Sequence, residues 1–145
     1  MATTPEKDRI TCHILDTTLG QPARSVRVKL ELTTSTSSTS TPSPSIPAGG
    51  AVFESQTDED GRIKSWLPYS SETSSGEVPI YTLEDVFGGI QGESRWTLRF
   101  DTESYFGKDK TFFPEVVVVF TVAEGQRYHV PLLLAPYSYS TYRGS

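Results

Sequence analysis

The sequence of 145 residues is poor in several residue types: it has one cysteine, two histidines and no asparagine. The single cysteine, Cys12, excludes an internal disulfide framework and is typical of a protein from a reducing compartment. Without asparagine the chain has no N-glycosylation site. The net charge is −5, and no cluster of lysine and arginine could follow a phosphate backbone. Nucleic acid is therefore not an expected partner.

Long apolar runs are missing too, because no segment approaches the length needed to cross a bilayer. Residues 1–9 are polar and charged, so we expect neither a secretory signal nor a membrane partner. The final Arg143-Gly144-Ser145 is not a peroxisomal address of the Ser-Lys-Leu type. The simplest expectation is a cytoplasmic protein, with a peroxisomal location left open.

Short segments of alternating apolar and polar residues indicate the fold. About eight such strands are predicted, with one short helix at Asp101–Gly107. The strands cover residues 10–16, 26–32, 51–57, 62–67, 96–100, 116–122, 128–134 and 137–142. The turn at 58–61 should join its two flanking strands as a hairpin, and the valine-rich strand 116–122 should be buried on both faces. We expect an all-β, antiparallel β-sandwich that forms a single domain over residues 1–145.

Two stretches, 33–50 and 68–92, interrupt this pattern with many serine, threonine, proline and glycine residues. We interpret both as irregular loop insertions, because they offer little apolar surface to offset the entropy lost on ordering. Within the second, Thr82–Phe87 could form a short capped helix. The sequence does not say what either insertion does.

Both histidines, His13 and His129, fall inside predicted strands, and alternation places His13 opposite to Cys12 and its apolar neighbours. If the two face the same space, they provide acid and base groups near neutral pH and could activate a water. Arg62 and Arg143 could bind a planar, oxygen-rich anion. From these residues alone, other interpretations remain open. Both histidines could have a structural role, Arg62 could be a solvated cation of the turn, and Arg143 could form an ion pair with the terminal carboxylate.

Other chemistries fit less well. A catalytic zinc usually requires three protein ligands, and Cys12 should point away from His13, so no metal site is expected. Ser140 and Ser145 lack the pattern of a nucleophile elbow. Cys12 itself is expected to fill the core.

Four stretches carry a family resemblance: Ile10–Ala23, Asp60–Ile63, Arg99–Val116, and Tyr128–Ser145, which ends in Tyr142-Arg143-Gly144-Ser145. On these residues the chain resembles the 5-hydroxyisourate hydrolases, the transthyretin-related enzymes of purine breakdown. The four stretches span most of the chain outside the two insertions.

The resemblance implies a transthyretin-like sandwich that assembles as a homotetramer with sites in grooves where dimers meet. It implies hydrolysis of 5-hydroxyisourate to 2-oxo-4-hydroxy-4-carboxy-5-ureidoimidazoline, without a cofactor. The catalytic positions would be His13, Arg62 and His129, and the substrate-binding positions would be Tyr142, Arg143, Gly144 and Ser145. The histidines would orient and deprotonate water, and Arg62 would stabilise the anionic intermediate. The sequence decides neither which histidine is the base nor which subunit supplies each residue.

Two alternatives belong to other functional classes. A transthyretin-type carrier of a small aromatic ligand would share the fold, but it needs an apolar channel with few catalytic groups. A noncatalytic sandwich that binds other proteins would leave the coincidence of the four stretches unexplained.

Overall fold

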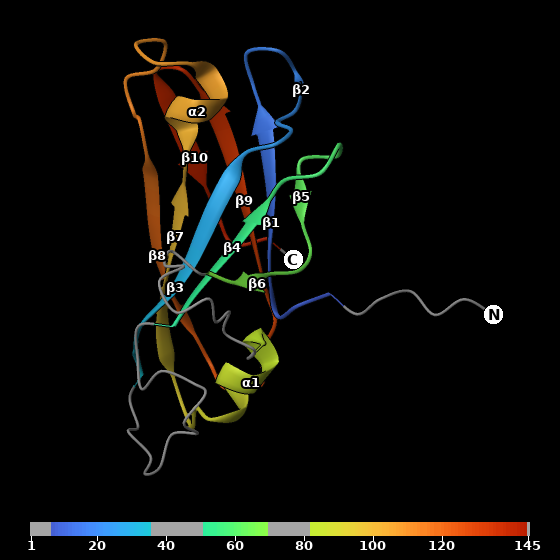
Figure 1. Cartoon of the computed structure of the whole chain (residues 1–145), viewed down its shortest axis with the longest axis vertical. Coiled ribbons are helices and arrows are strands. Elements are labelled where there is room, and N and C mark those ends of the chain that lie inside the picture. Colours follow the sequence, from blue (N-terminus) through green and yellow to red (C-terminus); the bar gives the residue numbers. More distant parts are fainter. Residues whose placement is uncertain (1–6, 36–50, 70–81, 145) are drawn as a thin grey trace, which may run out of the picture.

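The computed structural model describes residues 7–35, 51–69 and 82–144, which form two β-sheets packed face to face (Figure 1). The first sheet has the strand order β10-β9-β1-β2, and β5 pairs with the other half of β1. Its strands are β1 (Ile10–Asp16), β2 (Gln21–Pro22), β5 (Arg62–Ile63), β9 (Tyr128–Ala135) and β10 (Ser138–Thr141).

The second sheet has the order β6-β4-β3-β7-β8. Its strands are β3 (Arg27–Ser35), β4 (Val52–Gln56), β6 (Leu67–Pro68), β7 (Ser94–Phe100) and β8 (Val116–Val122). Two short helices, α1 (Leu83–Gly88) and α2 (Thr102–Phe106), lie at opposite ends of the sandwich (Figure 1). The all-β sandwich predicted from the sequence is confirmed, although three of the strands in the described part of the chain contain only two residues.

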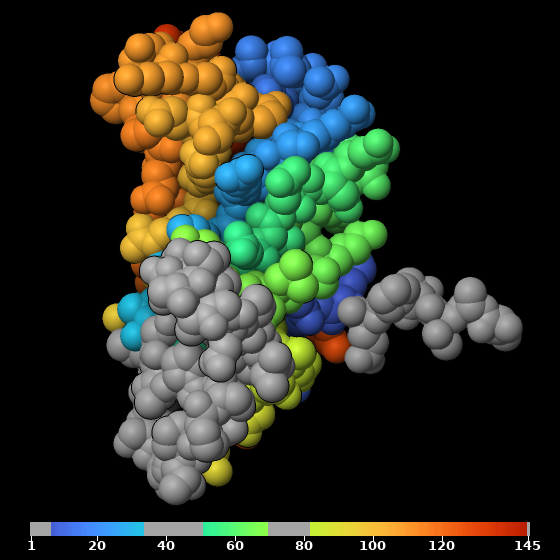
Figure 2. All heavy atoms as spheres, viewed as in Figure 1, coloured from blue at the N-terminus to red at the C-terminus, as the bar shows by residue number. Residues whose placement is uncertain are grey.

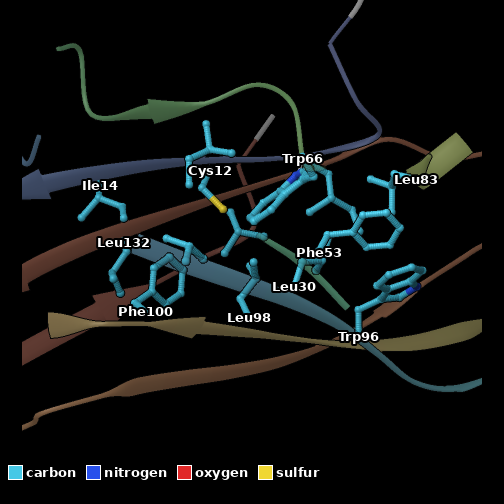
Figure 3. Packing of buried hydrophobic residues seen from close by; sticks show 14 of the residues in the cluster. Cys12, Ile14, Leu30, Phe53, Trp66, Leu83, Trp96, Leu98, Phe100 and Leu132 are labelled. Carbon is cyan, nitrogen blue, oxygen red and sulfur yellow. Dashed lines mark hydrogen bonds between the residues drawn. The ribbon is translucent and has the colours of Figure 1, made fainter. Parts of the chain in front are cut away.

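The core follows from the alternation of the strands. In β1 every second residue is buried, so Cys12 and Ile14 point between the sheets. From the second sheet Leu30, Leu98 and Phe100 pack against them (Figure 3). The opposite face of β1 carries Thr11, His13 and Leu15, which are only partly buried.

Two helices occur in the described residues where the count from the sequence predicted one. The additional helix, α1, lies inside the stretch 68–92 and was recognised only as a possibility. Thr82 caps it, because its side chain accepts a hydrogen bond from the Asp85 amide while the Asp85 carboxylate accepts one from the Thr82 amide. The part of that stretch over 70–81, and residues 36–50 of the first insertion, lie outside the described residues. Thr33–Ser35 belong to β3.

One strand pair departs from the predicted antiparallel arrangement, because β1 and β9 run parallel. These strands come from the two ends of the sequence, so no tight turn constrains their direction. The predicted hairpin around 58–61 is wrong: β4 pairs within the second sheet and β5 pairs with β1, so the chain crosses between sheets at this turn.

The prediction that 116–122 is buried on both faces is wrong for the single chain. The strand β8 is the edge of its sheet, and Val117 and Val119 are 41% and 56% exposed. Val116 and Val122 are buried, so only one face of the strand contributes to the core.

Candidate active site

Three chemically active side chains come from three neighbouring strands of the first sheet. Arg62 on β5 is the direct partner of His13 on β1, and His129 on β9 is the direct partner of Thr11, two residues before His13. Because side chains two residues apart share a face of a strand, Thr11 and His13 both point away from Cys12 and the core. The parallel pairing of β1 and β9 thus brings the two histidines of the chain to the same face.

The histidine rings lie close enough to act on one small molecule. Their centroids are 6.4 Å apart and the ring planes are inclined by 37°. A water or a carbonyl group between the rings would be within hydrogen-bonding reach of both.

His13 is held by a backbone carbonyl. Its Nε2 lies 3.0 Å from the carbonyl oxygen of Asp60. A carbonyl can only accept, so Nε2 carries the hydrogen and, in the neutral ring, Nδ1 has the free lone pair. The tautomer of His13 is therefore set by the turn that precedes Arg62.

That turn is fixed by its own hydrogen bonds. The Asp58 carboxylate accepts from the amides of Asp60 and Arg62, both at 2.9 Å. Gly61 has a φ of +73°, and a Cβ at this position would collide with the carbonyl oxygen of Ile14. Only glycine allows this close approach, which places Arg62 beside β1. In Figure 2 the turn (green) lies next to the residues that follow β1 (blue).

His129 has one polar contact at its ring and one at its backbone. Its Nδ1 lies 2.8 Å from the hydroxyl oxygen of Thr11. The Gly144 amide donates to the His129 carbonyl at 2.8 Å, and a Cβ on Gly144 would come within 2.6 Å of the ring atom Cδ2. The segment after β10 therefore packs directly on the imidazole.

Burial and a nearby cation lower the pKa of both histidines. For His13 burial is the main cause and the positive charge of Arg62 the second, while the hydrogen bond to Asp60 opposes them. For His129 burial again comes first, followed by Arg62, His13 and Lys7. Both imidazoles are therefore mostly neutral at neutral pH and able to accept a proton.

The four predicted substrate-binding residues are placed differently from one another. Gly144 touches His129, whereas Tyr142 is exposed. The Arg143 guanidinium lies over the ring of Tyr128, with Cζ 4.7 Å from the centroid. Ser145 lies outside the described residues.

Neither a group of metal ligands nor a membrane-spanning helix occurs in the part of the chain that the structure describes. Within 7–35, 51–69 and 82–144, no group of three or more His, Cys, Asp or Glu could hold a metal ion. In the same ranges no helix is long and apolar enough to cross a membrane. A cytoplasmic location stays a prediction.

The described candidate residues lie within a stretch that matches a known sequence family. The model of the HIUase/Transthyretin family matches residues 10–144. The chain belongs to this family. A probable 5-hydroxyisourate hydrolase of Schizosaccharomyces pombe is 36% identical over 143 residues, covering 97% of this chain and 94% of the relative.

Solved structures of the HIUase/transthyretin family share the architecture. The 5-hydroxyisourate hydrolase of Klebsiella pneumoniae has a TM-score of 0.58 at 25% identity, covering 94% of this chain and 98% of that one. A sea bream transthyretin in complex with thyroxine has a TM-score of 0.61 at 22% identity, covering 94% and 95%. The second similarity reflects the common fold alone.

Proposed function

We propose that this chain hydrolyses 5-hydroxyisourate to 2-oxo-4-hydroxy-4-carboxy-5-ureidoimidazoline. The observation that carries the proposal is the convergence of His13, Arg62 and His129 on one face of β5, β1 and β9. Two mostly neutral imidazoles and a guanidinium can supply the proton transfer and the oxyanion stabilisation that hydrolysis of a cyclic amide needs.

The reaction opens the six-membered ring at an amide bond. A water adds to the ring carbonyl carbon, its proton passes to one imidazole, and the carbonyl oxygen becomes an oxyanion next to Arg62. The carbon–nitrogen bond then breaks, the nitrogen receives a proton to complete the ureido group, and the carbonyl carbon becomes the carboxylate. The protein binds, orients and transfers protons, and no cofactor is needed.

The predicted tail residues complete the proposal. Gly144 lets the chain approach the His129 ring, and we assign Tyr142, Arg143 and Ser145 to binding of the substrate. Arg143 would leave the Tyr128 ring to reach a substrate anion, since a stacked guanidinium gains only about 0.5–2 kcal/mol at such a ring.

A homotetramer is the second part of the proposal. In the single chain the site lies on an open sheet face, whereas hydrolysis benefits from the exclusion of bulk water. The molecule also exposes large apolar side chains: Phe112, Val119, Tyr137 and Tyr139. Self-association would cover these residues and place the site in a groove between dimers.

The transthyretin-type carrier is the less supported function. Its fold is the same, but the two histidines and Arg62 would put acid–base groups and a charge on the face that a carrier of an apolar ligand needs to keep apolar.

The decisive experiment follows the ultraviolet absorbance of freshly generated 5-hydroxyisourate with and without the protein. We expect catalytic protein to accelerate the loss of absorbance through many turnovers per site. A carrier would instead deplete at most one molecule per site, and an unchanged rate would refute the proposal. His13→Ala at equal concentration is the control for adventitious hydrolysis.

A further inference from the structure

Thr11 is a polar residue of the site that the sequence reading did not single out. It is the direct partner of His129 across the parallel pair of β1 and β9, and it shares the outer face of β1 with His13. Its hydroxyl oxygen lies 2.8 Å from Nδ1 of His129. Because threonine is branched at Cβ, few rotamers are available, and the oxygen is held in place by the strand.

The same hydroxyl oxygen is within 3.5 Å of a second group, the carbonyl oxygen of Tyr128. A hydroxyl has a single hydrogen to donate but can also accept. When that hydrogen points to the Tyr128 carbonyl, the Thr11 oxygen accepts from Nδ1–H of His129. Nε2 is then the nitrogen with the free lone pair.

Protonation of the ring makes this arrangement necessary. An imidazolium has a hydrogen on both nitrogens, so Nδ1–H must find an acceptor, and Thr11 can accept only if its own hydrogen goes elsewhere. The Tyr128 carbonyl is the acceptor within reach. Gly144 meanwhile lies close to the ring, since a Cβ at this position would come within 2.6 Å of Cδ2.

We propose that Thr11 is a positioning residue that holds His129 in the tautomer with hydrogen on Nδ1, so that Nε2 exchanges protons with water or substrate. The inference rests on the proposed function for its catalytic meaning, but the tautomer itself can be measured without substrate. The two histidines would then use different nitrogens, Nδ1 on His13 and Nε2 on His129.

The first test uses the unmodified protein labelled with 15N-histidine. With only two histidines in the chain, two sets of ring signals are expected. We expect His129 to show hydrogen on Nδ1 and His13 to show hydrogen on Nε2. Hydrogen on Nε2 of His129 in the neutral ring would overturn the inference.

The second test compares a substitution that keeps the shape of Thr11 with one that keeps its hydroxyl group. Thr11→Val removes the hydroxyl and keeps the branched shape, so we expect kcat to fall by about 10- to 100-fold while KM changes little, because proton transfer is affected more than binding. Thr11→Ser restores the hydroxyl and should return most of kcat. In Thr11→Val the ring signals of His129 should move toward a mixture of tautomers, and those of His13 should stay in place.

Thr17→Val is the matched control. Thr17 also donates its hydroxyl to a carbonyl of β9, that of Leu134 at 3.3 Å, but it lies beyond the end of β1. We expect its variant to keep normal kcat. A folded Thr11→Val protein with wild-type kcat would overturn the inference. An unmodified protein that does not consume 5-hydroxyisourate would instead refute the proposed function.

Discussion

Arg62 places both histidines in one electrostatic environment. Its positive charge contributes to the lowered pKa of His13 and of His129, after the larger effect of burial. The group proposed to stabilise the anionic intermediate thus also favours the neutral form of both imidazoles, which can accept protons.

This coupling leads to a prediction about pH. Since both pKa values lie below the ordinary 6.5, activity should be lost on acidification only below that pH. Arg62→Gln removes the cation, so it should raise the pKa of both histidines, whereas Arg62→Lys should preserve most of the effect. Histidine ring signals followed by NMR from acid to neutral pH measure both values. Unshifted titration curves in Arg62→Gln would contradict the role given to Arg62.

The lowered pKa values of the two histidines also make the free energy of unfolding decrease as the pH falls. A lowered folded pKa means that the unfolded chain binds more protons between the folded value and 6.5. The contribution of the neutral histidines to the free energy of unfolding is therefore complete above pH 6.5 and is lost as the pH falls through the folded pKa values.

Removal of single side chains tests the proposed catalytic positions. His13→Ala and His129→Ala should each lower kcat/KM by about 10²- to 10⁴-fold, because each removes a positioned acid–base group. Arg62→Ala should show a comparable loss, with an additional rise in KM. Circular dichroism should show an intact sandwich in all three, since none of these side chains belongs to the buried core. Near-normal turnover in a folded variant would remove that residue from the mechanism.

At the residue scale, part of the site could be predicted and part could not. Alternation alone placed His13 opposite Cys12, and the resemblance pointed to Arg62 and His129. Thr11 could have been noticed because it shares the strand face of His13. The contact of Thr11 with His129 could not have been predicted, because this contact depends on the register of two strands from opposite ends of the chain.

At the scale of elements, Asp16 joins the end of β1 to α2. Its carboxylate is buried and accepts from the amides of Thr18 and Leu19 at 3.0 Å and from the Tyr105 hydroxyl at 2.7 Å. Burial, followed by the bond to Asp16, raises the pKa of Tyr105, so the phenol remains a donor at neutral pH.

Tyr105→Phe should therefore destabilise the fold more than it affects the chemistry. It leaves one buried carboxylate oxygen without its donor, which costs about 1.5–3 kcal/mol in the free energy of unfolding. Urea unfolding at fixed protein concentration measures the loss, and Tyr137→Phe, at a residue 75% exposed, is the matched control. Equal stability of the two variants would contradict the importance of this bond.

The errors in the predicted elements have physical reasons. The turn at 58–61 has the composition of a hairpin, but buried Thr57 donates to the Ala23 carbonyl and accepts from the Val26 amide, which directs the chain into the other sheet. For β8, a run of valines indicates a strand but does not reveal whether its second face is covered by the same chain. Both cases depend on long-range contacts, whereas alternation predicted the bounds of β1 correctly and the apolar run predicted those of β8 correctly.

At the scale of the whole molecule, we expect a tetramer in light scattering at micromolar concentration. Phe112 is 71% exposed, and its ring meets Phe113 edge to face at 4.9 Å, next to Tyr139 on β10. Phe112→Lys should place a charge in this aromatic cluster and yield smaller species. Lys108→Glu, at an exposed residue of the same loop, should leave assembly unchanged. A monomeric unmodified protein would contradict the predicted assembly.

The thiol of Cys12 can be used to detect opening between the two sheets of the sandwich. Cys12 is the only cysteine, it is fully buried, and burial raises the pKa of its thiol. It lies between Thr11 and His13 on β1 but faces the opposite way, so a thiol reagent can reach it only when the protein opens between the two sheets, beneath the face of the candidate site. The rate of labelling by such a reagent would therefore follow the local opening of the active-site sheet. Comparing that rate with and without bound substrate analogue would show how much ligand binding holds the two sheets together.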